Sequence, residues 1–359
     1  MVKIPGILSL SSVVLMLCQC LFLFSACVGD KNKTKIVNIP VEEVSEEQTD
    51  SIIIDSMPTA VEQFGQLSVL GNKIVDKNEK PVVLRGMSFC WSQWFGIFFT
   101  PEAVSWLKKD WKCTIVRAPL AVDFNGYLAH PEQEKAKVKI IIEAAIKEGL
   151  YVVIDWHDHE AEKHLKEAKA FFGEMAKLYG KYPNIIYEPY NEPLNISWNE
   201  VIKPYHEAII DTIRTHDPDN LIVCGTRNWS MQVDEPAANP IKGKNIAYTL
   251  HFYAGTHKKW LRDRADKALA EGIALMVTEY GTADAPDLRF VDAAETQAWW
   301  DWLEENQISY INWAVYDKLE ASSVLKPYAS TKGHWPVSHL TESGKLVRNH
   351  LISKGEQKN

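Results

Sequence analysis

Short apolar runs recur along the chain between residues 81 and 317, and amphipathic stretches separate most of them. The eight runs are Pro81–Ser88, Cys113–Leu120, Leu150–His157, Ile185–Pro193, Leu221–Thr226, Ile246–Tyr253, Ile273–Gly281 and Ile308–Asp317. Their cores, such as Val152-Val153-Ile154, are continuously apolar, which is typical of parallel strands that are buried on both faces. The pattern therefore predicts eight β-strands.

The stretches between the runs carry signals that begin and end helices. Thr100-Pro101 places proline at a first helical position, and Gly149 follows a helical spacing of apolar residues. The segment Ser197–Glu200 reads as a capping box, whereas the crossover after Thr226 contains two prolines and is predicted to be mostly loop. Strands that alternate with helices predict an α/β fold, a (β/α)8 TIM barrel over residues 61–353. An open doubly wound sheet is the alternative, but no glycine-rich phosphate turn follows the first run.

Two alternating runs around Gly71-Asn72 predict a β-hairpin over Gln66–Asp76. It precedes the first predicted barrel strand. We expect it to close one end of the barrel.

The first 60 residues differ in composition from the predicted barrel. An apolar run from about Ile7 to Phe24 ends in Ser25-Ala26-Cys27, which resembles a bacterial lipobox. We predict a signal peptide over residues 1–27, with Cys27 lipidated to anchor the exported protein to a membrane; an ordinary cleaved signal and an uncleaved anchor are the alternatives. Residues 28–60 are rich in acid and are predicted to be a flexible linker.

Composition narrows the classes of partner. The formal net charge is −8, so the chain lacks the basic field that holds nucleic acid, and no nucleic-acid partner is expected. Thirteen Trp and thirteen Tyr fit either stacking on sugars or an aromatic core. Cys90, Cys113 and Cys224 have no paired or metal-type spacing, so we expect buried free thiols. The protein is expected to be a monomer.

Polar and aromatic residues gather at the ends of the predicted strands. The carboxyl ends of barrel strands form the active site in this fold, and here they carry Arg117, Asp155-Trp156-His157, Asn191-Glu192, His251-Phe252-Tyr253, Glu279 and Trp313. A glutamate inside an apolar strand is costly unless it is hydrogen-bonded or functional. Glu192 and Glu279 fit the carboxyl pair of a glycoside hydrolase. A gap of about 5–5.5 Å between such carboxyls implies retention of configuration, and a wider gap implies inversion.

These residues resemble glycoside hydrolase family 5, and specifically its bacterial endoglucanase branch, from about Leu84 to about Leu340. Asn191-Glu192-Pro193 looks like the acid/base motif of the family, and Thr278-Glu279-Tyr280-Gly281 looks like its nucleophile motif. The resemblance implies a retaining cellulase with Glu192 as acid/base and Glu279 as nucleophile. It also implies substrate-binding or supporting roles for Arg117, His157, Asn191, His251, Tyr253, Trp313, Lys318 and Glu320.

The resemblance implies more specific contacts as well. Arg117 and Tyr253 would keep Glu279 ionised, Glu192 would start protonated, and Asn191 would bind the sugar 2-hydroxyl. The chain departs from the family after Ser88, where Phe89-Cys90-Trp91 stands in place of the His-Gly that relatives often carry. This departure is expected to alter contacts on the glycone side.

Simpler roles remain open for several residues. His157, Asp158 and His159 are possible metal ligands, but on a continuing strand the two histidines would point to opposite faces, so no metal or other cofactor is expected. We predict that Trp94 and Trp229 are sugar platforms. The helical spacing of Trp299, Trp300 and Trp302 predicts helix-to-barrel packing.

Three other functions compete with a β-glucanase that binds cellulose-type or mixed-linkage β-glucan. A mannan- or xyloglucan-active hydrolase would share the fold and both glutamates. A non-catalytic glycan-binding lipoprotein has no need to keep the glutamates together with Arg117, Asn191 and Tyr253. An aldolase-type barrel would require a lysine on a strand, and the predicted strand cores lack a convincing one.

Overall fold

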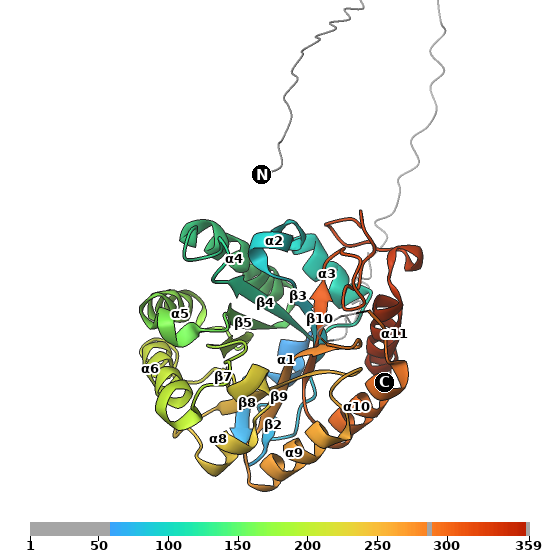
Figure 1. Ribbon diagram of the computed structural model, residues 1–359. Coiled ribbons are helices and arrows are strands. Elements are labelled where there is room, and N and C mark those ends of the chain that lie inside the picture. Colours follow the sequence, from blue (N-terminus) through green and yellow to red (C-terminus); the bar gives the residue numbers. More distant parts are fainter. Residues whose placement is uncertain (1–57, 286–288, 357–359) are drawn as a thin grey trace, which may run out of the picture. The chain divides into compact units, whose positions relative to one another are not determined.

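The computed structural model describes residues 58–285 and 289–356 (Figure 1). The predicted signal peptide, Cys27 and all but the last three residues of the predicted linker lie outside this range. Of those three, Thr59 caps the first helix and Ala60 begins it. Among the described residues, none of the helices has the length and apolar character needed to span a bilayer.

Eight parallel strands close into a barrel, as the apolar runs predict. They are β3 (Arg85–Phe89), β4 (Ile115–Ala121), β5 (Tyr151–His157), β6 (Ile185–Glu188), β7 (Leu221–Cys224), β8 (Ile246–Tyr253), β9 (Leu275–Gly281) and β10 (Tyr310–Val315). Each strand pairs with the next in sequence, and β10 pairs with β3 to complete the ring. The prediction of a (β/α)8 barrel is confirmed.

Helices surround the barrel in Figure 1 and cover its outer face. The main ones are α3 (Pro101–Lys109), α4 (Pro131–Glu148), α5 (Leu165–Tyr179), α6 (Lys203–Arg214), α9 (Lys259–Ala270), α10 (Ala293–Glu305) and α11 (Glu342–Glu356). Two of the predicted signals are in place: Thr100 Oγ1 accepts from Ala103 N at 3.2 Å, and Gly149 ends α4 with a φ of 68°. After β7 only two short helices occur, α7 (Arg227–Ser230) and α8 (Asp234–Ala238), consistent with the loop predicted there.

The predicted hairpin closes the amino-terminal end of the barrel. It consists of β1 (Ser68–Leu70) and β2 (Lys73–Val75), which follow α1 (Ala60–Phe64). Leu67 and Ile74 are buried in one apolar cluster with residues near the starts of the barrel strands, including Leu84 and Ile115. Because this end is filled by side chains, the opposite end carries the open site.

The predicted run Ile185–Pro193 is longer than the strand that forms. β6 ends at Glu188, so Glu192 lies on the loop after the strand and not inside it. The strand glutamate is Glu188, which sequence analysis did not single out. Proline at 189 explains the end, because it has no N–H to donate to a neighbouring strand.

Other packing predictions are confirmed. Cys90, Cys113 and Cys224 are free and buried. Trp299 and Trp300 are buried in the layer between barrel and helices, and Trp302 packs against its edge.

Candidate active site

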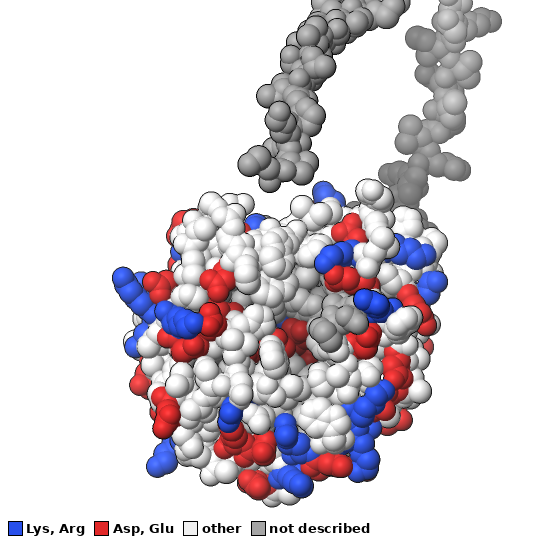
Figure 2. Space-filling model, in the orientation of Figure 1, with Lys and Arg blue, Asp and Glu red and all other residues white. Residues whose placement is uncertain are grey.

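A cavity of about 280 Å³ opens at the carboxyl ends of the strands. Figure 2 shows acidic side chains in the hollow at the centre of this face. The lining residues are Cys90, Trp91, Trp94, Phe95, His157, His159, Glu192, Tyr253, Glu279, Trp313, Tyr316, Lys318 and Glu320. Six of the ten predicted substrate-binding residues line the cavity: His157, Tyr253, Trp313, Lys318, Glu320 and Trp94. The other four are Arg117, Asn191, His251 and Trp229.

Arg117 on β4 is the buried hub beneath the cavity. Its Nη1 donates to Glu279 Oε2 at 3.1 Å, and its Nε donates to Glu188 Oε2 at 2.7 Å. Its Nη2 donates to Asn191 Oδ1 at 2.6 Å and lies 2.9 Å from Asp155 Oδ2. The side chain is fully buried, and the surrounding carboxylates hold the pKa of Arg117 above its ordinary value despite the cost of burial. One guanidinium thus fixes groups from three strands, β5, β6 and β9, and from the loop after β6.

Glu279 on β9 is held from two sides. In addition to Arg117, the Tyr253 hydroxyl donates to Glu279 Oε1 at 3.0 Å, as the resemblance implied. Burial and the nearby charge of Glu192 nevertheless place the pKa of Glu279 above its ordinary value. Burial and the adjacent Glu279 also raise the pKa of Tyr253, so its hydroxyl remains a donor.

Glu192 has a different partner, His251 on β8. His251 Nδ1 lies 2.9 Å from Glu192 Oε1, and His251 Nε2 lies 2.9 Å from Thr278 Oγ1. The Thr278 hydroxyl donates a hydrogen bond to Glu188 Oε1 at 2.5 Å, so its oxygen accepts a hydrogen bond from His251 Nε2–H. One further proton is then shared between His251 Nδ1 and Glu192.

The contact between His251 and Glu192 bears on the predicted protonation state of Glu192. Burial raises the pKa of Glu192, but the hydrogen bond and charge of His251 lower it more, and the result lies below the ordinary value. Burial lowers the pKa of His251, but the neighbouring carboxylates of Glu188 and Glu192 raise it to about 9. The prediction that Glu192 starts protonated in a less compensated setting is therefore wrong for the free site, because His251 faces Glu192 and holds the proton.

The two glutamates lie close together. One carboxylate oxygen of Glu192, one of Glu279 and a ring nitrogen of His251 all lie within 4.8 Å of one another. Glycosidases with inverting geometry keep their carboxyls about 6.5–9.5 Å apart, so this pair matches the closer arrangement.

Aromatic and charged groups form the walls of the cavity. Trp313 stacks on His157 with ring centroids 5.1 Å apart and an angle of 2° between the planes. Lys318 pairs with Glu320, and the Tyr316 hydroxyl donates to Glu320 Oε2 at 3.0 Å. The side-chain oxygen of Asn191 accepts from Arg117, so the side-chain nitrogen of Asn191 is the group that remains for a ligand. A flat apolar floor with polar groups at its edges suits a sugar ring.

Trp94 and Trp229 occupy different places. Trp94 borders the cavity and is 55% exposed. Trp229 is 47% exposed but does not line the cavity. The backbone N–H of Trp229 donates to Pro193 O at 2.9 Å, which fixes the loop after β7 against the segment that follows Glu192. Trp229 therefore lies beside the segment that follows Glu192.

Sequence analysis assigned no such role to several residues that contribute to the site. Glu188 and Thr278 have no family-independent signal except that a polar residue inside an apolar strand needs a partner. Asp155 accepts from His157 at 2.7 Å and from Arg117, so it orients two site residues. His159 Nδ1 lies 3.7 Å from Glu192 Oε2. Trp91 meets the His157 ring edge-on, with centroids 4.3 Å apart.

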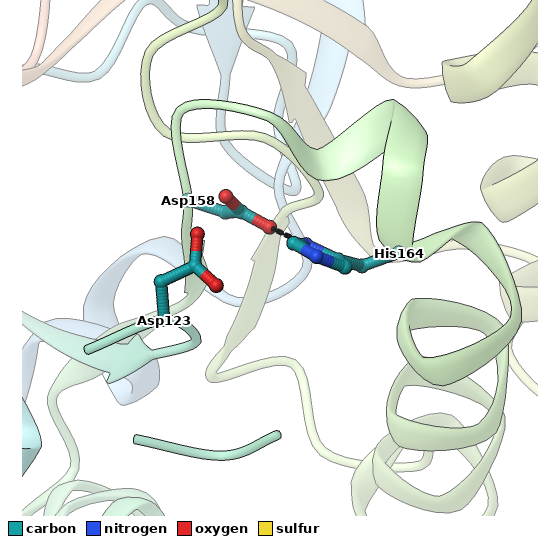
Figure 3. Close-up of side chains that lie close together, drawn as sticks. All are labelled: Asp123, Asp158 and His164. Atoms are coloured by element: carbon teal, nitrogen blue, oxygen red, sulfur yellow. Dashed lines mark hydrogen bonds and ion pairs between the residues drawn. The ribbon is translucent and has the colours of Figure 1, made fainter. Parts of the chain in front are cut away.

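The possible ligand set of His157, Asp158 and His159 does not form one cluster. The strand β5 ends at His157, so the side chains of His157 and His159 do not alternate between opposite faces of a continuing strand. Both His157 and His159 line the cavity. Asp158 instead accepts from His164 at 2.7 Å, beside Asp123, as Figure 3 shows. It also accepts from Trp156 Nε1 and from the N–H of Glu160. Protein donors thus satisfy Asp158, and its role here is to fix the loop after β5.

Comparison with known proteins places this geometry in a family context. The model of the cellulase family, glycosyl hydrolase family 5, matches residues 75–319. Endoglucanase Z of Dickeya dadantii is 50% identical over 80% of this chain, and an endoglucanase of Clostridium saccharobutylicum is 44% identical over 80%. The chain spans only 66% and 65% of the lengths of these two relatives.

Solved structures agree with that match. A structure from Cytophaga hutchinsonii is 53% identical, with a TM-score of 0.83 over 84% of this chain and 98% of that one. The catalytic domain of a Thermobifida fusca endoglucanase, solved as a variant in complex with cellotetraose, is 34% identical. Its TM-score is 0.79 over 82% of this chain and all of that one.

Proposed function

The chain belongs to glycoside hydrolase family 5, and from this premise we propose that it is an endo-acting β-1,4-glucanase that retains anomeric configuration. The observation that carries the proposal is the pair Glu192 and Glu279, whose nearest oxygens fall within 4.8 Å at the floor of an open cavity. That spacing matches the close carboxyl pair of a retaining enzyme, whereas an inverting enzyme keeps its carboxyls about 6.5–9.5 Å apart to admit a water.

In the first step, Glu279 attacks the anomeric carbon of the bound sugar. The bond from that carbon to the leaving oxygen breaks, and Glu192 protonates this oxygen, so the products are a shortened glucan with a new free hydroxyl and a glycosyl ester on Glu279. Arg117 and Tyr253 hold the Glu279 carboxylate in place through two hydrogen bonds. The shared proton reaches Glu192 along the 2.9 Å hydrogen bond from His251.

In the second step, water replaces the departed sugar. Glu192 takes a proton from this water, whose oxygen forms a bond to the anomeric carbon while the ester bond to Glu279 breaks. His251 faces Glu192 again and can share the proton that returns. The chain's own residues supply every proton transfer.

The proposed substrate is cellulose-type or mixed-linkage β-glucan. Trp313 offers a flat apolar surface, and the Lys318–Glu320 pair offers a donor and an acceptor to equatorial hydroxyls. The relatives named endoglucanase and the cellotetraose complex of a related catalytic domain support this choice. Mannan or xyloglucan activity is the competing outcome, because the glutamates serve either substrate equally.

A reducing-sugar assay on a panel of polymers tests the proposed activity. Carboxymethyl cellulose, barley β-glucan, mannan, xylan and xyloglucan are compared at equal mass, with Glu279→Gln as the blank. We expect the highest rates on the first two polymers. Preference for mannan or xyloglucan would replace the substrate, and no hydrolysis of any polymer would favour a glycan-binding protein.

We propose that the protein is exported and anchored through Cys27. Within the described residues, Thr59 and α1 lie at the closed end of the barrel, opposite the glutamates. Cell fractionation of the wild type and Cys27→Ala tests the anchor: we expect membrane association that the variant loses, and equal release of both would contradict it.

A further inference from the structure

A row of buried polar side chains connects His251 to Glu188. Its members are Glu188 on β6, Thr249 on β8 and Thr278 on β9, all fully buried. The strands β6 and β9 are not neighbours in the barrel, so the hydrogen bond between Thr278 and Glu188 crosses the barrel interior. Buried polar groups are costly unless each has a hydrogen-bond partner. The direction of each bond in this row can therefore be worked out from its partners.

Glu188 is held as a carboxylate at one end of the row. Arg117 Nε donates to Glu188 Oε2 at 2.7 Å, and Thr278 Oγ1 lies 2.5 Å from Glu188 Oε1. Burial raises the pKa of Glu188, but the charges of Arg117 and His251 lower it more, and the result lies below the ordinary value. An ionised carboxylate only accepts hydrogen bonds, so the Thr278 hydroxyl must donate to it.

The Thr278 hydroxyl has one proton and two lone pairs. Since the proton points to Glu188, the oxygen accepts from its two other neighbours, the Thr249 hydroxyl and His251 Nε2. His251 Nε2 lies 2.9 Å from Thr278 Oγ1 but 3.7 Å from Glu188 Oε1, which is too far for a direct hydrogen bond. A threonine hydroxyl is not a base at ordinary pH. It therefore requires a proton on Nε2 and does not remove it.

Other titratable groups surround His251 without bonding its ring. They are Glu279 on β9, Asp155 and His157 on β5, and Arg117 on β4, which pairs with both Glu279 and Asp155. Burial and the charge of Arg117 lower the pKa of His157, so this ring adds no charge of its own. Among the described residues, only Glu192 and Thr278 are hydrogen-bonded to the His251 ring. The proton on Nε2 is therefore set by Thr278, and the direction of the Thr278 hydroxyl is set by Glu188.

We propose that Glu188 is a positioning residue for the acid/base, and that it acts through the Thr278 hydroxyl on His251. The inference rests on the proposed function and concerns the same site. Because Nε2 keeps its proton throughout the cycle, His251 exchanges protons only through Nδ1, which lies 2.9 Å from Glu192 Oε1. Glu188 and Thr278 do not line the cavity, so they act without touching the substrate.

The fixed proton on Nε2 has a consequence for each step. In the first step, the proton passes from His251 Nδ1 to Glu192 and on to the leaving oxygen, which leaves His251 neutral. Nδ1 and the Glu192 carboxylate then face each other without a proton between them, so the pair takes one readily from the water of the second step. If the proton of Nε2 could shift to Nδ1, it would bond Glu192 and weaken this base.

Two substitutions break the row at different points. Thr278→Val keeps the branched shape but removes the hydroxyl, and Glu188→Gln introduces an N–H that can donate to Thr278 and reverse its hydroxyl. We expect each to lower kcat/KM on carboxymethyl cellulose by about tenfold or more and to move the alkaline limit to lower pH by about one pH unit. The burst rate on an aryl cellobioside, whose leaving group needs no acid, should change by less than about threefold.

Two further variants separate positioning from packing. Thr278→Ser keeps the hydroxyl and should return both the rate and the alkaline limit to near the wild-type values. Thr226→Val removes another fully buried threonine hydroxyl, which donates to Thr249 O at 3.4 Å, and should keep the alkaline limit. Equal losses on the polymer and the aryl substrate, an alkaline limit that Thr278→Val does not move, or a serine variant no better than valine would overturn the inference.

A measurement without turnover tests the same point apart from the proposed function. In wild type labelled with ¹⁵N at histidine, the ring signals of His251 are identified by their loss in His251→Asn. Nε2 should stay protonated on both sides of the His251 pKa of about 9, and Nδ1 alone should lose its proton there. An Nε2 that loses its proton instead would overturn the inference even in an active glucanase. A wild type that cleaves no glucan would overturn the proposed function, whatever the tautomer of His251.

Discussion

The two glutamates sit in unlike surroundings, although the reaction uses them together. Glu279 is part of a barrel strand and accepts hydrogen bonds from Arg117 and Tyr253, which have no proton to lose at ordinary pH. Glu192 is on a loop and faces His251, a group whose proton can move. The difference matches the two roles: a nucleophile must be fixed as a carboxylate, and an acid/base must exchange a proton twice in each cycle.

The largest expected effect separates the two roles directly. Glu279→Gln should lower kcat/KM by at least about 10⁴-fold on every substrate, because no nucleophile remains. Glu192→Gln should lose about 10²–10⁴-fold on cellulose-type polymers, but much less of the first step on an aryl cellobioside whose leaving group needs no proton. Burst kinetics on the aryl substrate measure this. Equal losses for both variants on both substrates would remove the distinction.

Arg117 binds Glu279 and also Asn191, the residue before Glu192, so its replacement should affect both stability and rate. Arg117→Met leaves the buried carboxylates of Asp155, Glu188 and Glu279 without their counter-charge, at a cost of about 3–5 kcal/mol in the free energy of unfolding. Urea denaturation measures the cost. Arg214→Met, which removes a guanidinium bonded to backbone carbonyls at the opposite end of the barrel, is the control. A loss no greater than that of the control would contradict the hub role.

The shared proton sets an alkaline limit on activity. Because His251 has a pKa of about 9, the His251–Glu192 pair loses its proton as the pH rises through that value, and the acid is then absent. We expect kcat/KM to fall above about pH 9 in the wild type. In His251→Asn the limit should move to lower pH, because Glu192 must hold the proton alone. A pH profile with the same alkaline limit in both proteins would show that another group sets it.

A smaller effect on the rate is expected when the hydrogen bond from Tyr253 to Glu279 is removed. Tyr253→Phe removes one of two hydrogen bonds to the carboxylate, worth about 0.5–1.5 kcal/mol, or up to about tenfold in kcat. It should also raise the pKa of Glu279 further, so the acid limb of the profile moves to higher pH. A shift of the alkaline limb instead would assign Tyr253 to the acid/base. The acid limb of kcat/KM is the quantity to compare.

Much of this arrangement is predictable from sequence, and the reasons differ by residue. Continuous apolar runs predict the strands because both faces of each are buried, and the hairpin follows from Gly71-Asn72. Glu279, Tyr253 and Arg117 lie within strands, so the strand ends place them together. The apolar run continues past Glu188, so the sequence predicts a strand that includes Glu192, and only Pro189 signals that the strand ends earlier.

The proton arrangement was not predictable in the same way. Which glutamate His251 faces depends on the register of β8 against β9 and on the direction of the loop after β6, neither of which is encoded in local spacing. Local patterns therefore give the elements, whereas tertiary contacts give the pKa values.

The most direct test of the account is to trap the intermediate that only one glutamate can form. The wild type is incubated with a 2-deoxy-2-fluoro-β-cellobioside that has a good leaving group, and the protein is digested and sequenced by mass spectrometry. We expect a mass increase of one fluorinated cellobiosyl group, located on Glu279. A stable label on Glu192, or hydrolysis of this reagent with inverted configuration and no covalent species, would contradict it.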